Sequence, residues 1–305
     1  MKKALLYSIF ALGIASTTLT SCEDIFGGFL DKQPSNELTG EQVFSDWNLT
    51  VQFHLDTYNF LRHGAGRIST TWLDAATDLA ETSYGNGVRT SFNIGNFYGG
   101  SGASELVDTW EHYYRGIRKC NMLLTRIEEV PQNPADSEDK YNRDKKNYIA
   151  EARFLRAYFY WELFLRYGPI PIVTEVLDPN GDLMSKYTTR PTTKEYVVDF
   201  ILEELKSCEG NLLDYETAWK SSSAGRIGQP MACALRSRIM LFMASPRYSS
   251  ESGITWQQAA DVAKEFIDTY GTNFALFNAK DATGATLGIE NYTNALLRTA
   301  YQGSN

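Results

Sequence analysis

The stretch EARFLRAYFYWELFLRYGPIP, residues 151–171, is almost wholly apolar apart from five charged side chains. A helix that is apolar on nearly every side is buried on most of them. The stretch ends in Gly168-Pro169-Ile170-Pro171, which stops a helix because proline cannot continue one and glycine favours its end. We therefore predict a helix from Asp144 to Tyr167 that is buried on most sides.

The charged side chains of this helix need partners inside the fold, because an unpaired buried charge is costly. At about 100° per residue, Glu151, Glu162 and Arg166 share one narrow sector, whereas Arg153 and Arg156 lie away from it. An interhelical ion-pair network is the favoured interpretation. A charged-ligand site is the alternative.

The rest of the chain predicts more helices, because apolar residues recur at helical spacing. Thr39 and Gln42 resemble a capping pair, and Thr192 or Thr193 can cap a later helix. The expected helices cover residues 43–61, 105–130, 192–213, 228–245 and 255–270, with a short one at 73–81. The predicted fold class is all-α, with tetratricopeptide-like helix pairs joined by long irregular loops.

The N-terminus has the pattern of a bacterial lipoprotein signal. Lys2 and Lys3 precede an apolar run at 4–15, and Leu19-Thr20-Ser21 leads directly to Cys22. The apolar run suits a signal peptide and is shorter than the roughly 20 residues that span a bilayer. Cys22 is therefore predicted to be lipidated, with acyl chains such as palmitate holding it at a membrane. An ordinary signal peptide with a chance cysteine is the alternative.

The predicted domain organisation follows from this signal. Residues 1–21 form the signal peptide, residues 22–38 a lipidated tether, and residues 39–305 one helical domain. No later segment is apolar enough to cross a membrane. The net charge of −8 argues against binding to nucleic acid, or to anionic lipid through a basic face.

The remaining cysteines and the histidines predict no metal or cofactor. Apart from Cys22, the cysteines lie in helical stretches, so buried free thiols are expected rather than a disulfide framework. The histidines show no spacing typical of metal ligands. These residues are Cys120, Cys208, Cys233, His54, His63 and His112.

Residues 65–104 form a long excursion rich in small polar and aromatic residues. Sugars present apolar C–H faces to aromatic rings and hydroxyls to Asp, Asn and Arg, and long loops in compact domains are often functional. The loop residues that suit such contacts are Tyr84, Arg89, Asn93, Asn96, Phe97 and Tyr98. The alternative is that these aromatic side chains pin the loop to the helices.

No strong catalytic motif is present. Gly99-Gly100-Ser101-Gly102 is a near miss for a hydrolase nucleophile turn, but no strand precedes it. Asp74, Asp78 and Glu81 share one face of a short helix. Glycoside hydrolysis needs two carboxylates at a defined separation, and a solvated acidic face is the commoner explanation.

Several motifs together resemble the SusD/RagB family of nutrient-binding lipoproteins. Phe29-Leu30-Asp31-Lys32-Gln33-Pro34 is similar to the segment that follows the family's anchor. The most specific match is Glu151-Ala152-Arg153-Phe154-Leu155-Arg156-Ala157, followed by Tyr167-Gly168-Pro169-Ile170-Pro171. Another resembles the family's Trp…Tyr…Ile…Asn helix and comprises Trp110, Tyr114, Ile117, Cys120 and Asn121.

This resemblance implies a starch-binding SusD-like protein in the outer membrane, exposed at the cell surface. Such a protein captures an oligosaccharide or polysaccharide nutrient without cleaving it and delivers it to a SusC-like TonB-dependent transporter. The resemblance supports Asp78, Arg89, Asn96 and Tyr98 as ligand contacts, beside Tyr84 and Phe97 from the loop.

Family chains are usually longer, so the domain at 39–305 is expected to be C-terminally incomplete. Two other functions remain open. The chain could be a transporter-associated helical scaffold that binds no sugar of its own, or a surface glycoside hydrolase.

Overall fold

The computed structural model describes residues 39–62, 73–80, 93–95, 104–178, 180–182, 186–220 and 223–274. The predicted signal peptide, the tether and Cys22 lie outside these ranges. The chain divides into two units, residues 1–43 and 44–305, and the packing below is that of the second unit. Within the described ranges, no helix has both the length and the apolar character that a bilayer-spanning helix needs.

The regular elements of the described residues are helices, with no β-strand among them, which confirms the predicted all-α class. The α-helices are α3 (Gly40–Phe44), α4 (Trp47–Leu55), α6 (Ser104–Arg126), α7 (Glu138–Tyr167), α9 (Glu203–Glu209), α10 (Tyr215–Lys220), α11 (Gln229–Met243), α12 (Ser249–Ser252) and α13 (Trp256–Tyr270). Short 3₁₀ turns are η2 (Asp56–Phe60), η4 (Leu73–Ala76), η5 (Ile127–Glu129) and η7 (Gly271–Asn273), and a π-helix, η6, covers Lys194–Leu202.

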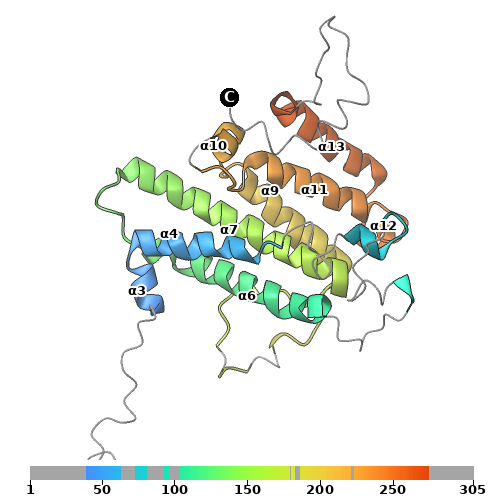
Figure 1. Ribbon diagram of the computed structural model, residues 1–305, viewed down its shortest axis with the longest axis horizontal. Coiled ribbons are helices and arrows are strands. Elements are labelled where there is room, and N and C mark those ends of the chain that lie inside the picture. The colour runs from blue at the N-terminus through green and yellow to red at the C-terminus, as the bar shows by residue number, and fades with distance from the viewer. Residues whose placement is uncertain are drawn as a thin grey trace, which may run out of the picture. The chain divides into compact units, whose positions relative to one another are not determined.

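The main helices pack in the order of the chain (Figure 1). Helix α6 lies against α7, α7 against α9, α9 against α11, and α11 against α13. The N-terminal α4 packs on both α6 and α7. This succession of neighbouring helices is the arrangement expected of tetratricopeptide-like pairs, in which each helix buries its apolar face on the next.

Helix α7 is the buried helix that the sequence predicts, and it begins six residues earlier, at Glu138. Ser137 caps this start, because its Oγ accepts a hydrogen bond from Lys140 N at 3.3 Å. The helix ends where predicted, before Gly168, whose φ of 67° suits glycine. The fully buried side chains include Ala152, Leu155, Ala157, Phe159, Tyr160 and Leu163.

A glycine sets the close approach of α6 to α7. A Cβ placed on Gly116 would lie 2.7 Å from Cε2 of the Phe159 ring. Phe159 is fully buried and stacks on Tyr113 with ring centroids 5.5 Å apart, so the ring has little room to move. The absence of a side chain at Gly116 therefore allows the two helices to pack at this distance.

The predicted continuous helix at 43–61 is wrong, because Asp46 interrupts it. Asp46 is extended (φ −134°, ψ 127°), and its Oδ1 accepts a hydrogen bond from Leu49 N at 2.9 Å. An aspartate in this conformation ends one helix and caps the next. The predicted capping pair is confirmed, since Gln42 N donates to Thr39 Oγ1 at 3.3 Å and Thr39 N donates to Gln42 Oε1 at 2.8 Å.

Other elements also differ from the prediction. The helix expected at 192–213 starts as the π-helix η6 and stops at Glu209, before the turn at Gly210. The short helix expected at 73–81 is only the 3₁₀ turn η4. Helices α10 and α12 were not predicted, because each is six residues or fewer and shows too little periodicity to detect.

The charges on α7 form the predicted network, beginning with Glu151. Glu151 is fully buried and accepts a hydrogen bond from Tyr58 Oη at 2.7 Å; His54 Nε2 lies 2.8 Å from the same carboxylate. Arg226 Nη2 completes the cluster at 2.5 Å from Glu151 Oε1. One carboxylate thus joins α4, η2, α7 and the segment before α11.

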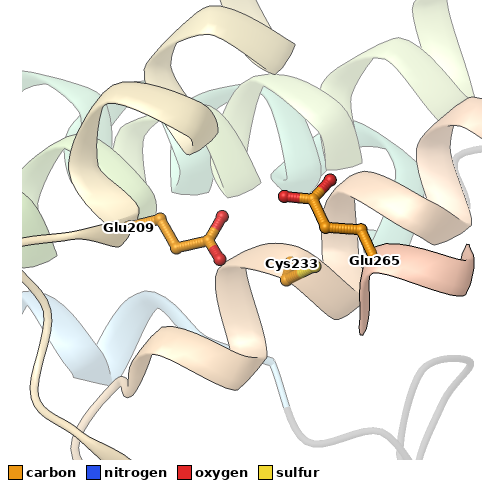
Figure 2. Close-up of side chains that lie close together, drawn as sticks. All are labelled: Glu209, Cys233 and Glu265. Carbon is orange, nitrogen blue, oxygen red and sulfur yellow. The ribbon is translucent and has the colours of Figure 1, made fainter. Parts of the chain in front are cut away.

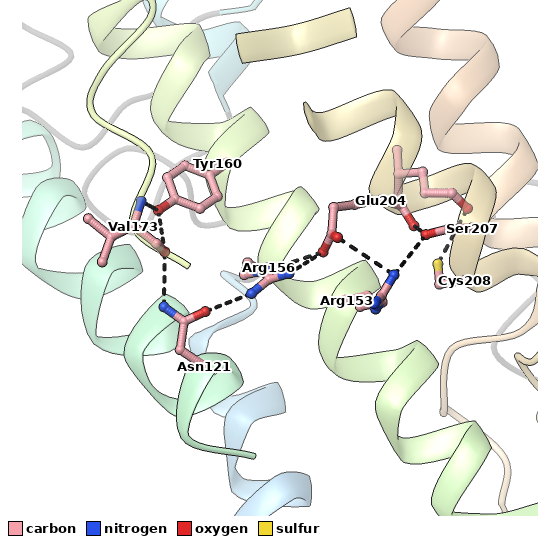
Figure 3. A network of polar contacts seen from close by, with 9 residues as sticks. Asn121, Arg153, Arg156, Tyr160, Val173, Glu204, Ser207 and Cys208 are labelled. Carbon is pink, nitrogen blue, oxygen red and sulfur yellow. Dashed lines mark hydrogen bonds and ion pairs between the residues drawn. The ribbon is translucent and has the colours of Figure 1, made fainter. Parts of the chain in front are cut away.

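Arg156 joins α7 to two further helices (Figure 3). Its Nη1 donates to Asn121 Oδ1 on α6 at 2.8 Å, and its Nη2 donates to Glu204 Oε2 on α9 at 2.6 Å. Arg153 lies beside the same Glu204, at 3.9 Å, and also donates to Ser207. The interhelical ion-pair interpretation is confirmed for Glu151, Arg153 and Arg156. Glu162 instead pairs with Arg166 inside α7, at 3.0 Å.

The expected free thiols are also confirmed. Cys120, Cys208 and Cys233 are buried and form no disulfide bonds. Burial raises the pKa of Cys120 and Cys208 to about 12 and that of Cys233 to about 11, because a thiolate is poorly solvated there.

Candidate functional site

Of the residues predicted to suit ligand contact, the structure describes Asn93 and Asp78, which is exposed just after η4. Nearby, Asn93 Nδ2 donates to the carbonyl oxygen of Ala75 at 3.0 Å, and this bond joins two separate parts of the excursion. The predicted contacts Tyr84, Arg89, Asn96, Phe97 and Tyr98 lie outside the described residues. They stay predictions.

A cluster of aromatic side chains lies where the excursion rejoins the helices. Trp110 on α6 is 41% exposed, and its ring centroid is 4.9 Å from that of Tyr114 and 5.2 Å from that of Tyr167. The latter two are half-buried. We call these three residues the Trp110 corner. The excursion is attached beside it, because the chain re-enters α6 at Ser104, about 9 Å along the helix from Trp110 at 1.5 Å per residue.

Local sequence explains how the Trp110 corner forms. Trp110 and Tyr114 are four residues apart, so they lie on one face of α6. Tyr167 is the last residue of α7, before the chain turns at Gly168. Tyr114 Oη donates to the carbonyl oxygen of Pro171 at 2.9 Å, which fixes the turn against α6. Burial raises the pKa of Tyr114, so its hydroxyl keeps the proton that it donates.

A cleft of about 500 Å³ adjoins the Trp110 corner. Arg190 links the two, because its Nη1 donates to the carbonyl oxygens of Tyr167 at 3.2 Å and Pro169 at 3.3 Å. The described lining of this cleft consists of Pro169, Arg190, Pro191, Thr192, Thr193 and Glu251.

The cleft and the Trp110 corner offer complementary contacts to a sugar. Exposed rings can stack on apolar C–H faces, while Arg190 and Glu251 can bond to hydroxyls. A hydrogen bond from Thr193 and another from Arg247 lower the pKa of Glu251, which therefore stays an acceptor. Glu251 is the one carboxylate among the described lining residues. Glycoside hydrolysis usually requires a pair of carboxylates.

One other cluster resembles a metal site in composition. Glu209, Cys233 and Glu265 have potential ligand atoms within 4.8 Å of one another (Figure 2). Arg236 lies between the carboxylates, with Nη1 at 2.6 Å from Glu209 and Nη2 at 2.8 Å from Glu265. Tyr270 also donates to Glu209, at 2.7 Å. A guanidinium therefore already pairs with both carboxylates that would bind a cation.

The sequence identifies Trp110 only as part of a family motif and does not predict that its side chain is exposed. Ile117, Cys120 and Asn121 of the same motif are at most 1% exposed, so they belong to the core. A tryptophan that remains in water beside a long aromatic-rich segment is a signal for ligand contact. Periodicity alone does not reveal it, because the buried Tyr113 and Ile117 follow the same helical spacing as Trp110.

The comparisons with known proteins agree on one family. The model of a SusD-like family described as "Starch-binding associating with outer membrane" matches residues 28–241. A SusD-like protein of Formosa agariphila is 25% identical over 216 residues, which are 70% of this chain and 39% of that protein. A second SusD-like protein of the same organism is 25% identical over 167 residues, or 29% of its own length. The chain therefore spans well under half the length of these curated relatives.

Solved structures show the same fold. A SusD-like protein from Bacteroides fragilis is 26% identical with a TM-score of 0.55, over 81% of this chain and 42% of that chain. A laminarin-binding SusD-like protein has a TM-score of 0.55 at 20% identity, over 86% of this chain and 50% of that chain. The helical arrangement is thus that of the SusD-like proteins.

Proposed function

The chain belongs to the SusD-like family, described as starch-binding and associated with the outer membrane, and from this premise we propose that it binds a nutrient glycan without cleaving it. The exposed Trp110 is the observation that carries the proposal. Ile117, Cys120 and Asn121 of its motif are buried, whereas Trp110 is 41% exposed. The laminarin-binding relative supports a glycan as the ligand class.

The proposed contacts divide between rings and polar groups. Trp110 supplies the stacking surface, and Arg190 with Glu251 supplies hydroxyl contacts from the cleft. The exposed Asp78 and the loop residues that are not described would extend this surface. These residues are Tyr84, Arg89, Asn96, Phe97 and Tyr98.

The cellular role that we propose combines an anchor and a partner. Cys22 would carry the lipid and hold the helical domain at the outer surface of the outer membrane. The domain would then pass its glycan to a SusC-like TonB-dependent transporter. Cys22→Ala is expected to leave sugar affinity unchanged and to impair uptake by cells.

The binding proposal is tested by isothermal titration of the protein with soluble polysaccharides, including starch and laminarin. Trp110→Ala should weaken the binding of the active polysaccharide by about 5- to 30-fold, the change that a loss of about 1–2 kcal/mol produces. The matched control is Trp219→Ala on α10, because Trp219 is also exposed, at 69%, and lies outside this site. Equal affinities for the two variants would overturn the site assignment.

A transporter scaffold that binds no sugar is the competing function. It predicts no heat from any polysaccharide, while the transporter still co-purifies with the chain. Release of reducing ends from the bound polysaccharide would instead establish glycoside hydrolysis.

A further inference from the structure

A second cleft lies at the opposite end of α7 from the Trp110 corner. Its volume is about 590 Å³, and it separates the first turns of α7 from the connection between α9 and α10. We call it the Asn142 cleft. The residues that line it are Asp139, Asn142, Arg143, Lys146, Asn147, Gly210, Asn211, Leu212, Leu213, Asp214 and Gln229.

The wall of the Asn142 cleft is held by buried amide groups. Asn147, which is buried, donates from Nδ2 to the carbonyl oxygen of Asn211 at 3.2 Å. Gln229 donates from Nε2 to the carbonyl oxygen of Leu212 at 3.2 Å and from its backbone N to that of Leu213 at 2.8 Å. These bonds fix the connection in place, so the cleft is a built feature rather than a gap between loose segments.

Four side chains of the lining keep their hydrogen-bonding capacity. Asp139, Asn142 and Lys146 lie on one face of α7 because they are three or four residues apart. Asn211 lies on the other wall. Within the described part of the chain, the side chains of these four residues have no hydrogen-bond or ion-pair partner. They provide both donors and acceptors to whatever occupies the cleft.

The charges around the Asn142 cleft cancel. Asp139 and Asp214 are balanced by Arg143 and Lys146. Hydrogen bonds from Thr217 lower the pKa of Asp214, so this carboxylate is charged at neutral pH. An ion of either sign would therefore meet two like charges as well as two opposite ones, whereas a neutral polyhydroxyl compound meets amides, charged groups that can bond to hydroxyls and the apolar side chain of Leu213. The lining thus matches a neutral sugar better than an ion.

We propose that the Asn142 cleft is a second glycan-binding site, which takes a neutral oligosaccharide segment independently of the Trp110 corner. The choice of glycan as ligand rests on the proposed function. Asn142 and Tyr167 are 25 residues apart on the same helix, so the two sites are about 37 Å apart at 1.5 Å per residue. One long polysaccharide can therefore engage both sites, which raises its apparent affinity over that of a short oligosaccharide.

The test is hydrogen–deuterium exchange of the full chain, read by mass spectrometry, with maltohexaose and laminarihexaose as probes. Binding in the cleft protects the backbone amides of residues 209–216. Binding at the Trp110 corner protects those of residues 104–116. We expect the same hexasaccharide to protect both segments.

Two variants remove the Asn142 cleft by different means. Asn142→Ala combined with Asn211→Ala removes its free amides. Gly210→Leu narrows it without strain, since φ is −66° and an added Cβ meets no atom within 4 Å. Both should abolish protection of 209–216 and leave protection of 104–116. Glu138→Gln is the control on the same helix, because Glu138 is exposed outside the cleft and should change neither segment.

The outcomes separate this proposal from the proposed function. Protection of 104–116 alone in the unmodified chain overturns the Asn142 cleft and keeps the Trp110 corner. Protection of 209–216 alone supports the cleft and overturns the corner. Protection of neither segment by either hexasaccharide overturns both, and undiminished protection of 209–216 in the two cleft variants overturns the cleft.

Discussion

Replacing Glu151 tests whether the most family-specific motif of this chain serves structure or ligand binding. Glu151 is 0% exposed. Its carboxylate lies 2.7 Å from Tyr58 Oη, 2.8 Å from His54 Nε2 and 2.5 Å from Arg226 Nη2. Glu151→Ala removes the acceptor for all three and leaves the guanidinium of Arg226 without its carboxylate. Breaking a buried ion pair in this way costs about 3–5 kcal/mol.

The structure places Glu151→Ala near the lower end of that range. Arg226 keeps a hydrogen bond to Asn147 at 2.5 Å and lies 4.6 Å from the ring centroid of Tyr148, so two favourable contacts of its guanidinium remain. We expect a loss of about 3 kcal/mol. Glu151→Gln keeps the shape and one acceptor oxygen but not the charge, and should cost about 2 kcal/mol, as expected for charged hydrogen bonds.

Urea unfolding, followed by circular dichroism, measures these losses as shifts of the midpoint. Glu128→Gln is the matched control, because the Glu128 side chain is 67% exposed and pairs with Lys145 at the surface. Such a pair contributes about 0–1 kcal/mol. Below its unfolding transition, the Glu151→Gln protein should bind glycan as the unmodified chain does.

Two results would contradict the structural role of Glu151. One is a Glu151→Gln midpoint equal to that of the unmodified chain. The other is a stably folded Glu151→Gln protein with affinity for glycan reduced tenfold or more, which would make Glu151 a ligand contact.

The other two predictions concern packing and thiol chemistry. Gly116→Ala should destabilise the fold by about 1–2 kcal/mol, because the 2.7 Å clash with Phe159 outweighs the usual helix preference for alanine. The control Gly210→Ala should not destabilise it, because an added Cβ meets no atom there. Equal melting temperatures of the two variants would contradict this prediction. At pH 8, roughly a quarter of a free cysteine is in the thiolate form. The raised pKa values of the three buried cysteines reduce their thiolate fraction to about one part in a thousand or less. In a Cys22→Ala chain, reaction with Ellman's reagent should therefore be at least about 100-fold slower in the folded state than in urea, and equal rates would refute the burial of Cys120, Cys208 and Cys233.

Local signals in the sequence predicted helices and several of their ends well, but they predicted interruptions within a helix poorly. The end of α7 at Gly168 and the start of α13 after Thr255 follow from glycine and capping chemistry. The break at Asp46 was missed because the apolar pattern continues across it. The sequence placed Glu151 in a sector that needs a partner, but His54 is 97 residues away, and only tertiary packing brings them together.

The site was harder to predict because it depends on exposure rather than on pattern. Trp110 and Ile117 both fit the apolar spacing of α6, yet the first is 41% exposed and the second 1%. Spacing cannot distinguish them, since the difference comes from what α7 covers. Asp78 is exposed just after η4, and its contact with ligand stays a prediction.

The motifs that identify the family are mostly occupied in holding the scaffold together. Glu151 and Arg156 are bonded to other helices inside the fold, so their replacement affects stability first. Trp110 is different because most of its motif is buried while its ring reaches solvent beside the excursion. The scaffold can therefore accept changes in the exposed Asp78 or Arg190 with little cost to packing, since surface substitutions usually alter stability by no more than about 0.5 kcal/mol. Ligand preference should thus follow these surface residues, and exchanging them between SusD-like chains should transfer glycan preference without changing the melting temperature.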